Sequence, residues 1–561
     1  MSKTQFSLII GFLCILVGVF ISTNQLIGLF RPSGFVISPQ LDLGAVLFKA
    51  VLVLSGAYII LLRYLPGSSG SSSETSLSQA TSMKSAYFIL AGFVVIALIL
   101  RLYNLGVGIW FDEMLTHVNY MSMTLGEIVS TYDDANNHLL FTILARISLF
   151  IFGDSVWAFR LPAVLFGVGS ILALYSFSKR VGTTKESLFA VALFTFSYHH
   201  IWFSQNARGY TALLFFTILS STFLLVALQQ NSPRKWLLYA SAAFLGAYTH
   251  LTMGFVVVAH FVIYIFHLYK KTESRGNEKW IGLIYGFIPV GLVTLQAYAL
   301  ILPSMFGGGV LASGMQSEEM AWTNPIWALM EIVKGMQVGF ANGGVALIAF
   351  FIFSIGVIDF VRKKAEVIGL LFIPTILGFS IMISIGYTLF PRFFFFAMGF
   401  GVIVVIRGSM VTGNYIGKIL KLPQSKAHLP GILLCIAIVL AALSSTRYVF
   451  YPKQDFVGAM KLIEKEKAIS DSIITLGIAD FPFNKFYKKN WVNVKTIKEL
   501  ESARMSEKRT WLIYIMPVHA EAAYPKIMKQ VRKDYTVVKQ FYGTLNGGDV
   551  VVCLENQKVL P

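Results

Sequence analysis

Two adjacent carboxylates, Asp112 and Glu113, follow the apolar segment 86–105 in the run WFDEMLT. A carboxylate that is half-shielded where a bilayer gives way to water can keep a raised pKa and accept a proton from a hydroxyl. The pair therefore has the chemistry of a general base. The competing interpretation is structural, with Asp112 capping the next helix and Glu113 solvated in its first turn.

Two histidines lie near the same predicted membrane boundary. His138 begins the apolar run HLLFTILARISLFIFG, and His250 lies in the tetrapeptide YTHL at the end of a later apolar segment. His138 can bind an anion or a metal, although a polar residue at a membrane interface is the plainer interpretation of a single histidine. A divalent metal on His138, His250 and Glu113 stays open. We therefore predict no definite cofactor.

Two arginines occupy comparable positions at the ends of apolar segments. Arg208 lies between two such segments in SQNARGY, and Arg392 follows a proline at the start of the aromatic run FPRFFFF. A fixed guanidinium can pair bidentately with a phosphate. The alternative is an arginine that snorkels to lipid headgroups. Both arginines, both histidines and the carboxylate pair are predicted to share one face of the membrane.

These polar groups are few in a very apolar chain. Of 561 residues, 56% are hydrophobic and only 13% are charged, against about 25% in an ordinary soluble domain. The composition excludes a soluble enzyme over most of the length, and 14% aromatic residues exclude a disordered chain. We assign the net charge of +18 to cytoplasmic loops rather than to nucleic-acid binding. The three cysteines have neither the spacing of a metal site nor that of a disulfide framework.

Runs of about 20 apolar residues predict a polytopic α-helical membrane protein. We expect about thirteen transmembrane helices, at residues 7–30, 43–64, 86–105, 157–178, 186–203, 210–228, 236–250, 254–269, 280–302, 341–361, 366–389, 393–409 and 430–446. The Ser-rich stretch 67–85 is typical of a flexible linker. Residues 1–66 would then form an accessory pair of helices beside a catalytic core at 86–446.

The orientation follows from the short basic loops, which stay on the cytoplasmic side. Five basic clusters lie at residues 179–185, 234–235, 270–279, 362–364 and 418–426. They alternate consistently with the helices only if the run His138–Gly153, which carries Arg146 in its middle, is an interfacial helix on the outer surface. Residues 107–156 then form a large outer loop, and the polar motifs and the tail after Ser445 are extracytoplasmic. The compact loops and the absence of an obvious organelle signal are compatible with the plasma (inner) membrane of a bacterium.

The tail at residues 447–561 has the charge content of a soluble protein, with 19 Lys+Arg and 12 Asp+Glu. Its apolar segments predict strands at Ser472–Gly477, Trp511–Met516, Thr536–Tyr542 and Asp549–Leu554. Helices are expected between them, at Lys495–Met505 and Ala522–Tyr535. We predict a small extracytoplasmic α/β domain. It contains neither a Gly-rich phosphate loop nor a metal-binding cluster of residues, so we assign it no chemistry.

The polar motifs resemble, in their order, those of GT-C glycosyltransferases of the protein O-mannosyltransferase and lipid A aminoarabinose transferase type. In chain order they are Asp112–Glu113, His138, Arg160–Ala163 (RLPA), Gln205–Tyr210 (QNARGY), Tyr248–His250 (YTH) and Pro391–Phe393 (PRF). The resemblance covers roughly 86–445. The chain departs from the family beside His138, where an acidic residue and two prolines are common in the family and Asn137 and Leu139 stand here. That departure weakens the metal interpretation.

The resemblance implies a GT-C-like membrane enzyme that moves a sugar from a polyprenyl-phosphate donor to an acceptor hydroxyl outside the cytoplasm, usually with inversion. Asp112 matches the family's general base, and Glu113 would support it. The donor phosphate and substrate would be bound by His138, Gln205, Arg208, Tyr210, His250 and Arg392. The implied partners are the lipid-linked donor, the bilayer and an acceptor that is a protein, a lipid or a polysaccharide.

Two further classes of function are compatible with parts of the sequence. A transporter or flippase of lipid-linked sugars would need the basic phosphate site but not Asp112 as a base. Such a protein would place more ionisable groups near the bilayer midplane than this chain does. A scaffold or signalling protein acting through the outer domain would leave the polar residues at the membrane boundary unexplained. The glycosyltransferase is therefore the interpretation that uses most of the residues.

Overall fold

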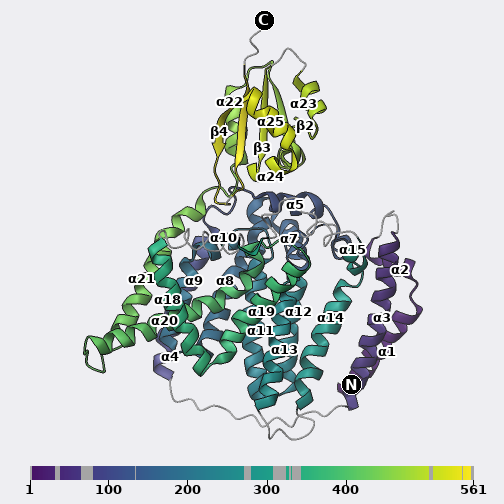
Figure 1. The fold of residues 1–561 in the computed structure, drawn as a ribbon. Coiled ribbons are helices and arrows are strands. Elements are labelled where there is room, and N and C mark those ends of the chain that lie inside the picture. The colour runs from purple at the N-terminus through teal and green to yellow at the C-terminus, as the bar shows by residue number, and fades with distance from the viewer. Residues whose placement is uncertain are drawn as a thin grey trace.

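The computed structural model describes residues 3–31, 38–64, 80–132, 134, 136–270, 279–307, 324–326, 330, 343–504, 509–545 and 547–556. Figure 1 shows a broad region of roughly parallel helices with a small sheet domain on one of its faces. We call this face the domain-bearing face. The helices at its surface, α5, α7 and α10, lie between the long helices and the sheet domain (Figure 1).

The helical region is built from nineteen described α-helices. They are α1 (Lys3–Phe20), α2 (Thr23–Phe30), α3 (Pro39–Leu61), α4 (Ala80–Leu102), α5 (Phe111–Tyr120), α6 (Leu125–Ser130), α7 (Leu139–Phe152), α8 (Val156–Val181), α9 (Thr184–Phe196), α10 (Tyr198–Ser204), α11 (Tyr210–Gln230), α12 (Pro233–Thr249), α13 (Met253–Lys270), α14 (Ile288–Tyr298), α15 (Leu302–Phe306), α18 (Gly343–Lys363), α19 (Ala365–Ser384), α20 (Met398–Ile419) and α21 (Leu429–Ser445). Short turns η1 (Leu62–Tyr64), η3 (Leu283–Phe287), η5 (Pro391–Ala397) and η6 (Thr446–Phe450) join or extend them.

Within the described residues, eight helices are long and apolar enough to cross a membrane. The number is nine if α1 and α2, which are bent by 108° at their junction, form one span. Each of the thirteen predicted segments is helical over most of its described length, but several are short or interrupted. A break at Ser197 divides α9 from α10, and α12 has only 17 residues. Length alone therefore supports fewer spans than the sequence predicted.

Helix α7 is the run that the sequence placed at the interface. It has 14 residues, which at 1.5 Å per residue is about 21 Å, shorter than the roughly 30 Å hydrocarbon core. The start of α4 also refines the predicted boundaries, since α4 begins at Ala80, inside the predicted linker. The rest of that linker, residues 67–79, lies outside the described residues.

The two N-terminal helices pack closely against each other and against the core. Gly11 of α1 faces Gly56 of α3, where a Cβ atom would lie 2.8 Å from the opposite carbonyl oxygen, so only glycine permits this approach. Gly44 of α3 packs equally closely against the backbone of Leu300, where a Cβ atom would clash with the Leu300 carbonyl oxygen. The Tyr58 hydroxyl donates to the Ile284 carbonyl. The N-terminal helix pair therefore packs directly against the core.

Arg31, at the end of α2, attaches the N-terminal pair to the loop that precedes His138. Its Nε donates to the Ser130 hydroxyl at 2.9 Å, and its Nη2 donates to the Ser130 carbonyl and the Thr131 hydroxyl, both at 2.7 Å. Tyr132 and Leu139 pack in one apolar cluster with residues of α2, α3 and α15. The N-terminal pair thus supports the segment that leads into α7.

We expect Arg31→Ala to loosen this segment without unfolding the protein. The variant removes three hydrogen bonds, one of them to a backbone carbonyl, each contributing about 1 kcal/mol or more when the donor is charged. Hydrogen exchange of residues 124–138 should become faster, while exchange in α8 and α11 stays unchanged. Arg63→Ala, which changes an arginine at the other end of α3, is the control. Equal exchange in the Arg31→Ala variant and the wild type would contradict the supporting role.

The C-terminal domain is a five-stranded mixed sheet in the order β2-β1-β3-β5-β4. Its strands are β1 (Ser472–Leu476), β2 (Val492–Val494), β3 (Thr510–Ile515), β4 (Tyr535–Phe541) and β5 (Val550–Glu555). β1 runs parallel to β2 and β3, whereas β5 runs antiparallel to β3 and β4. Helical elements cover the sheet: α22 (Phe456–Glu466), η7 (Gly477–Ala479), η8 (Phe481–Phe486), α23 (Ile497–Arg504), α24 (Pro517–Ala523) and α25 (Pro525–Asp534). The small sheet domain predicted at the C-terminus is confirmed, and its shortest strand, β2, was missed.

Helix α5 is held between this domain and the long helices. Ile109 and Met114 are buried in the same apolar cluster as Phe483 and Trp511 of the domain. The Gln454 side chain accepts a hydrogen bond from the Phe111 N–H at 2.9 Å. On the neighbouring α10, the Trp202 indole donates to the Thr544 hydroxyl at 2.8 Å. The domain therefore fixes the position of the helix that carries Asp112 and Glu113.

Candidate active site

Asp112 lies in the first turn of α5, shielded but not sealed from solvent. Its side chain is 13% exposed, and one carboxylate oxygen lies 3.6 Å from Nη2 of Arg392. Within the described residues, Arg392 is the only side chain that pairs with it. The distance is longer than a direct hydrogen bond. The carboxylate thus has a cationic neighbour and oxygen lone pairs that no donor among the described residues occupies.

Glu113 has a different environment, because its side chain is completely buried. It forms a two-pronged ion pair with Arg160, from Nε to Oε1 at 2.8 Å and from Nη2 to Oε2 at 2.6 Å. It also accepts the N–H groups of Trp110 at 2.9 Å and Ala207 at 2.5 Å. The interpretation of Glu113 as a solvated first-turn residue is therefore wrong.

The electrostatics of Glu113 follow from these contacts. Burial by itself would raise the pKa of the carboxyl, but the charges of Arg160 and Lys453 and the hydrogen bonds from Arg160 and Ala207 lower the pKa to about 2. The Lys453 Nζ lies 3.9 Å from Oε2. Glu113 stays ionised at neutral pH and holds no free lone pair for a substrate proton. It fixes the start of α5, the helix that carries Asp112.

Arg160 also holds the segment that leads into α5. Its guanidinium donates to the carbonyls of Leu105, Val107 and Gly108, each at 2.8 Å. Gly108 has a positive φ of 62°, a conformation that favours glycine. Arg160 was quoted in the RLPA motif but not named among the site residues. The signal was present, since an arginine in an apolar helix must find partners in the protein.

His138 and Arg208 meet on the same side of α5 as Asp112. The Gly209 N–H donates to Nδ1 of His138 at 2.8 Å, so the neutral ring carries its proton on Nε2. That Nε2–H lies 3.2 Å from Nη2 of Arg208, which is also a donor. Two donors this close repel each other, and one acceptor placed beside them can accept from both. An anionic oxygen satisfies both.

Arg208 is positioned by α5 and by the loop before α7. Its Nη1 donates to the Thr116 hydroxyl and the Asn136 carbonyl, both at 3.0 Å. Thr116 lies four residues after Asp112 and therefore on the same face of α5. Nη1 of the guanidinium is therefore already hydrogen-bonded to the protein, whereas the buried Nε has no partner among the described residues. Thr116 positions Arg208, and no motif in the sequence singled it out.

His250 and Tyr210 complete an aromatic group around His138. The His138 ring lies 4.7 Å from the His250 ring and 5.3 Å from the Tyr210 ring, both edge to face. Burial first, and then the charges of Arg208 and Arg392, lower the pKa of His250 to about 3 and that of His138 well below its usual range. Both histidines are therefore neutral at neutral pH. They act through hydrogen bonds and shape rather than through charge.

Arg392 lies on η5, the 3₁₀ turn that precedes α20. Its guanidinium carbon lies 4.1 Å from the centre of the Phe390 ring and 5.4 Å from that of Trp110, which keeps the cation in a weakly hydrated setting. Its Nε is buried and has no partner among the described residues. Arg392 lies beside Asp112, and its charge also lowers the pKa of His138 and of His250. The candidate site therefore includes both arginines, Arg208 and Arg392.

The predicted residue Gln205 lies in a neighbouring network. Its side-chain amide donates to the carbonyls of Leu100, Arg101 and Tyr103 at 3.3, 3.1 and 2.7 Å, which fastens α10 to the end of α4. Its backbone carbonyl accepts from Lys453. In this arrangement Gln205 positions the QNARGY loop, and its amide hydrogens do not face Arg208.

The residues considered for a metal do not assemble into a metal site. Glu113 is fully engaged by Arg160, and Nδ1 of His138 accepts the Gly209 N–H. Nδ1 of His250 lies 2.8 Å from the Thr252 hydroxyl. In the described part of the chain, no three His, Cys, Asp or Glu side chains are grouped as metal ligands would be. The donor set that the structure offers suits an anion instead.

Comparison with known proteins gives one family match and several related folds. Residues 137–294, less than a third of the chain, match the family model of dolichyl-phosphate-mannose-protein mannosyltransferase. No curated protein matches the sequence. ArnT from Cupriavidus metallidurans in the apo state is similar in structure, with a TM-score of 0.50 and 11% identity over 84% of this chain and 98% of that chain.

Two other solved structures are more weakly similar. ArnT from Cupriavidus metallidurans bound to undecaprenyl phosphate gives a TM-score of 0.47 and 11% identity over 84% of this chain and 99% of that chain. The oligosaccharyltransferase AglB from Archaeoglobus fulgidus, in complex with an inhibitory peptide and a dolichol-phosphate, gives 0.47 and 9% over 86% of this chain and 75% of that chain.

The matched segment contains much of the predicted donor site. It begins one residue before His138 and includes Arg208 and His250, whereas Asp112 and Arg392 lie outside it. The fold shared with apo ArnT extends over most of the chain. Residues 137–294 are thus similar to the protein mannosyltransferase family, and most of the chain shares the fold of ArnT.

Proposed function

We propose that the protein is an integral membrane glycosyltransferase that moves a sugar from a polyprenyl-phosphate donor to an acceptor hydroxyl. The observation that carries this proposal is that a partly buried carboxylate lies near hydrogen-bond donors that have no acceptor among the described residues and could bind an anion. Asp112 offers oxygen lone pairs, while the buried Nε atoms of Arg208 and Arg392 have no partner among the described residues. The Nε2–H of His138 adds another donor beside Arg208.

The reaction follows from these positions. The acceptor oxygen forms a bond to the anomeric carbon of the donor sugar while its proton passes to the Asp112 carboxylate. The bond from the anomeric carbon to the phosphate oxygen breaks, and its electron pair leaves with the polyprenyl phosphate. Arg208, Arg392 and His138 stabilise the charge that develops on that oxygen, and such a donor is worth about 3–4 kcal/mol in other enzymes. A single displacement inverts the anomeric centre.

The donor class is supported by two features. The family model that matches residues 137–294 is named for a dolichyl-phosphate-linked mannose, and the site residues stand at the ends of apolar helices that can hold a prenyl chain. We further propose that the domain-bearing face is extracytoplasmic and the membrane is a plasma (inner) membrane. The positions of the basic loops in the sequence support this orientation. The acceptor is a protein, lipid or polysaccharide hydroxyl on that side.

The test is turnover of radiolabelled polyprenyl-phosphate sugars by the purified protein in nanodiscs containing a membrane extract as acceptor source. We expect release of polyprenyl phosphate from one donor, and about 10²–10³-fold slower release by Arg208→Gln, because a phosphate donor is lost. Arg447→Gln, which alters an exposed arginine beyond the end of α21, should turn over like the wild type.

Transport is distinguished from transfer in the same system. The sugar is followed into acceptor, and in sealed vesicles the sidedness of the intact lipid-linked sugar is followed as well. Movement of the intact donor across the bilayer with no sugar transferred would overturn the enzyme in favour of a flippase. Equal turnover by Arg208→Gln and the wild type would remove Arg208 from the phosphate site.

A further inference from the structure

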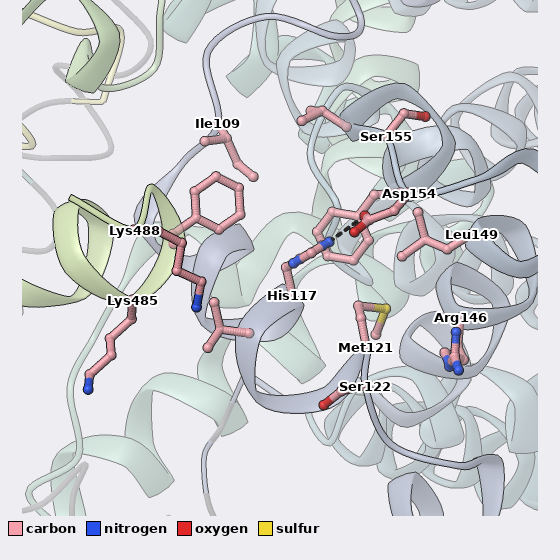
Figure 2. A pocket seen from close by; sticks show the side chains of 14 residues that line it. Ile109, His117, Met121, Ser122, Arg146, Leu149, Asp154, Ser155, Lys485 and Lys488 are labelled. Atoms are coloured by element: carbon pink, nitrogen blue, oxygen red, sulfur yellow. Dashed lines mark hydrogen bonds and ion pairs between the residues drawn. The ribbon is translucent and has the colours of Figure 1, made fainter. Parts of the chain in front are cut away.

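A cleft of about 630 Å³ lies on the side of α5 away from Asp112. It is lined by Ile109 before α5, by His117 within it and by Met121 directly after it, so it runs along the helix that carries Asp112. Figure 2 shows that Lys485 and Lys488 of the C-terminal domain form one wall. Its volume is within the range of about 300–1,000 Å³ that ligand pockets occupy.

The opposite wall of the cleft belongs to the helical region. Figure 2 shows Arg146, Leu149 and Asp154 there, across from the two lysines, with His117 between the walls. The cleft therefore requires both the domain and the membrane core, and neither part forms it alone.

The charge of the cleft is strongly unbalanced. Arg146, Lys485 and Lys488 are cationic, and the single carboxylate among the lining residues, Asp154, is bonded to His117 at 2.8 Å. Arg146 uses its Nε on the Met123 carbonyl at 3.1 Å. Within the described chain, none of the three cations forms an ion pair in the cleft. An anionic ligand is therefore favoured over a neutral or cationic one.

The cleft also offers aromatic surface. The rings of Phe159 and Phe486 lie edge-on to the His117 ring, at 5.3 and 5.6 Å between centroids. Phe159 is fully buried, but the partly exposed Phe486 ring beside these cations suits a ligand with both C–H faces and charged groups, such as an oligosaccharide bearing carboxylates or phosphates. A bilayer lipid is less well matched, because one wall of the cleft comes from the domain that stands beyond α5 (Figure 1).

We infer that this cleft is a subsite for a distal, anionic part of the acceptor, and that the acceptor is an oligosaccharide or glycan carrying carboxylate or phosphate groups. The inference rests on the proposed function for the statement that the ligand is the acceptor. His117 lies five residues after Asp112, about 7–8 Å along the helix axis. Because the two residues also lie about 140° apart around the helix, the acceptor passes around α5, and several sugar units separate the part bound in the cleft from the hydroxyl that reacts beside Asp112.

The experiment measures binding without any donor, using the full-length protein in phosphatidylcholine nanodiscs. The probes are trigalacturonate, a phosphorylated mannotriose and neutral maltotriose. We expect at least one anionic probe to bind, maltotriose to bind at least about tenfold more weakly, and K485Q/K488Q to lose about tenfold in affinity for the anionic probe. The matched control K526Q/K529Q changes two exposed lysines of α25 and should bind like the wild type. The preferred anionic probe distinguishes carboxylate from phosphate.

Several results would overturn the inference. These are no binding of either anionic probe, equal binding by K485Q/K488Q and the wild type, or equal losses in the two double variants. A cleft variant that changes only association with phosphatidylglycerol nanodiscs would assign the cleft to lipid headgroups and also overturn it. Because no donor is present, the result does not depend on turnover. A protein that binds the anionic probe through the cleft yet turns over no polyprenyl-phosphate sugar would refute the transferase and leave the cleft standing.

Discussion

Replacing Asp112 with Asn is expected to slow sugar transfer by about 10²–10⁴-fold, the usual contribution of a positioned general base. Asparagine keeps the size of the side chain but cannot take the proton of the acceptor hydroxyl. The carboxylate is 13% exposed and is paired only loosely with Arg392 at 3.6 Å, so its loss should not disturb the fold. The measurement is single-turnover release of polyprenyl phosphate, together with the equilibrium affinity for the donor.

The donor affinity separates the base from a merely electrostatic role. If Asp112 acts on the acceptor proton, donor affinity changes little in the Asn variant while the rate falls. Asp42→Asn is the matched control, since Asp42 also lies in the first turn of a helix, α3, and is exposed. If the fall in donor affinity accounts for the whole loss of rate, the role of Asp112 is to position Arg392. If the rate is unchanged, Asp112 takes no part in the reaction.

The residues of the candidate site could be selected from the sequence because ionisable residues are rare in apolar segments. His138, Arg208 and Arg392 each interrupt long runs of hydrophobic residues, and such residues either bind a ligand or find a partner in the protein. Periodicity also placed four of the five strands of the C-terminal domain within a residue or two. These features are local, so one segment at a time suffices to find them.

The pairings within the site were not predictable, because they depend on residues far apart in the chain. Glu113 and Arg160 are 47 positions apart, and Lys453 reaches the same carboxylate from the C-terminal segment. The motif DE gives no sign of which carboxylate is buried. The helix geometry decides it, since neighbouring residues on a helix differ by about 100° in direction. Asp112 therefore faces the site while Glu113 points into the protein.

Glu113→Gln is expected to destabilise the protein by about 3–5 kcal/mol, because it leaves Arg160 as an uncompensated buried charge. Both partners of the pair are about 1% exposed or less, so water cannot replace the carboxylate. The measurement is unfolding in mixed micelles with increasing denaturing detergent at pH 7. Glu127→Gln is the matched control. Glu127 likewise reaches back to the N-cap N–H of its own helix, at 2.7 Å, but has no arginine partner among the described residues.

The pH dependence gives this prediction a second, independent check. The pKa of Glu113 is about 2 in the folded protein, below the value of about 4.3 expected in the unfolded chain. Its contribution is therefore fully present above about pH 4.3 and is lost as the pH falls toward 2. The difference in stability between the wild type and Glu113→Gln should be constant from pH 7 to 5 and shrink below about pH 4. A loss no larger than that of Glu127→Gln, or a difference that does not shrink in acid, would mean that the ion pair does not hold α5 in place.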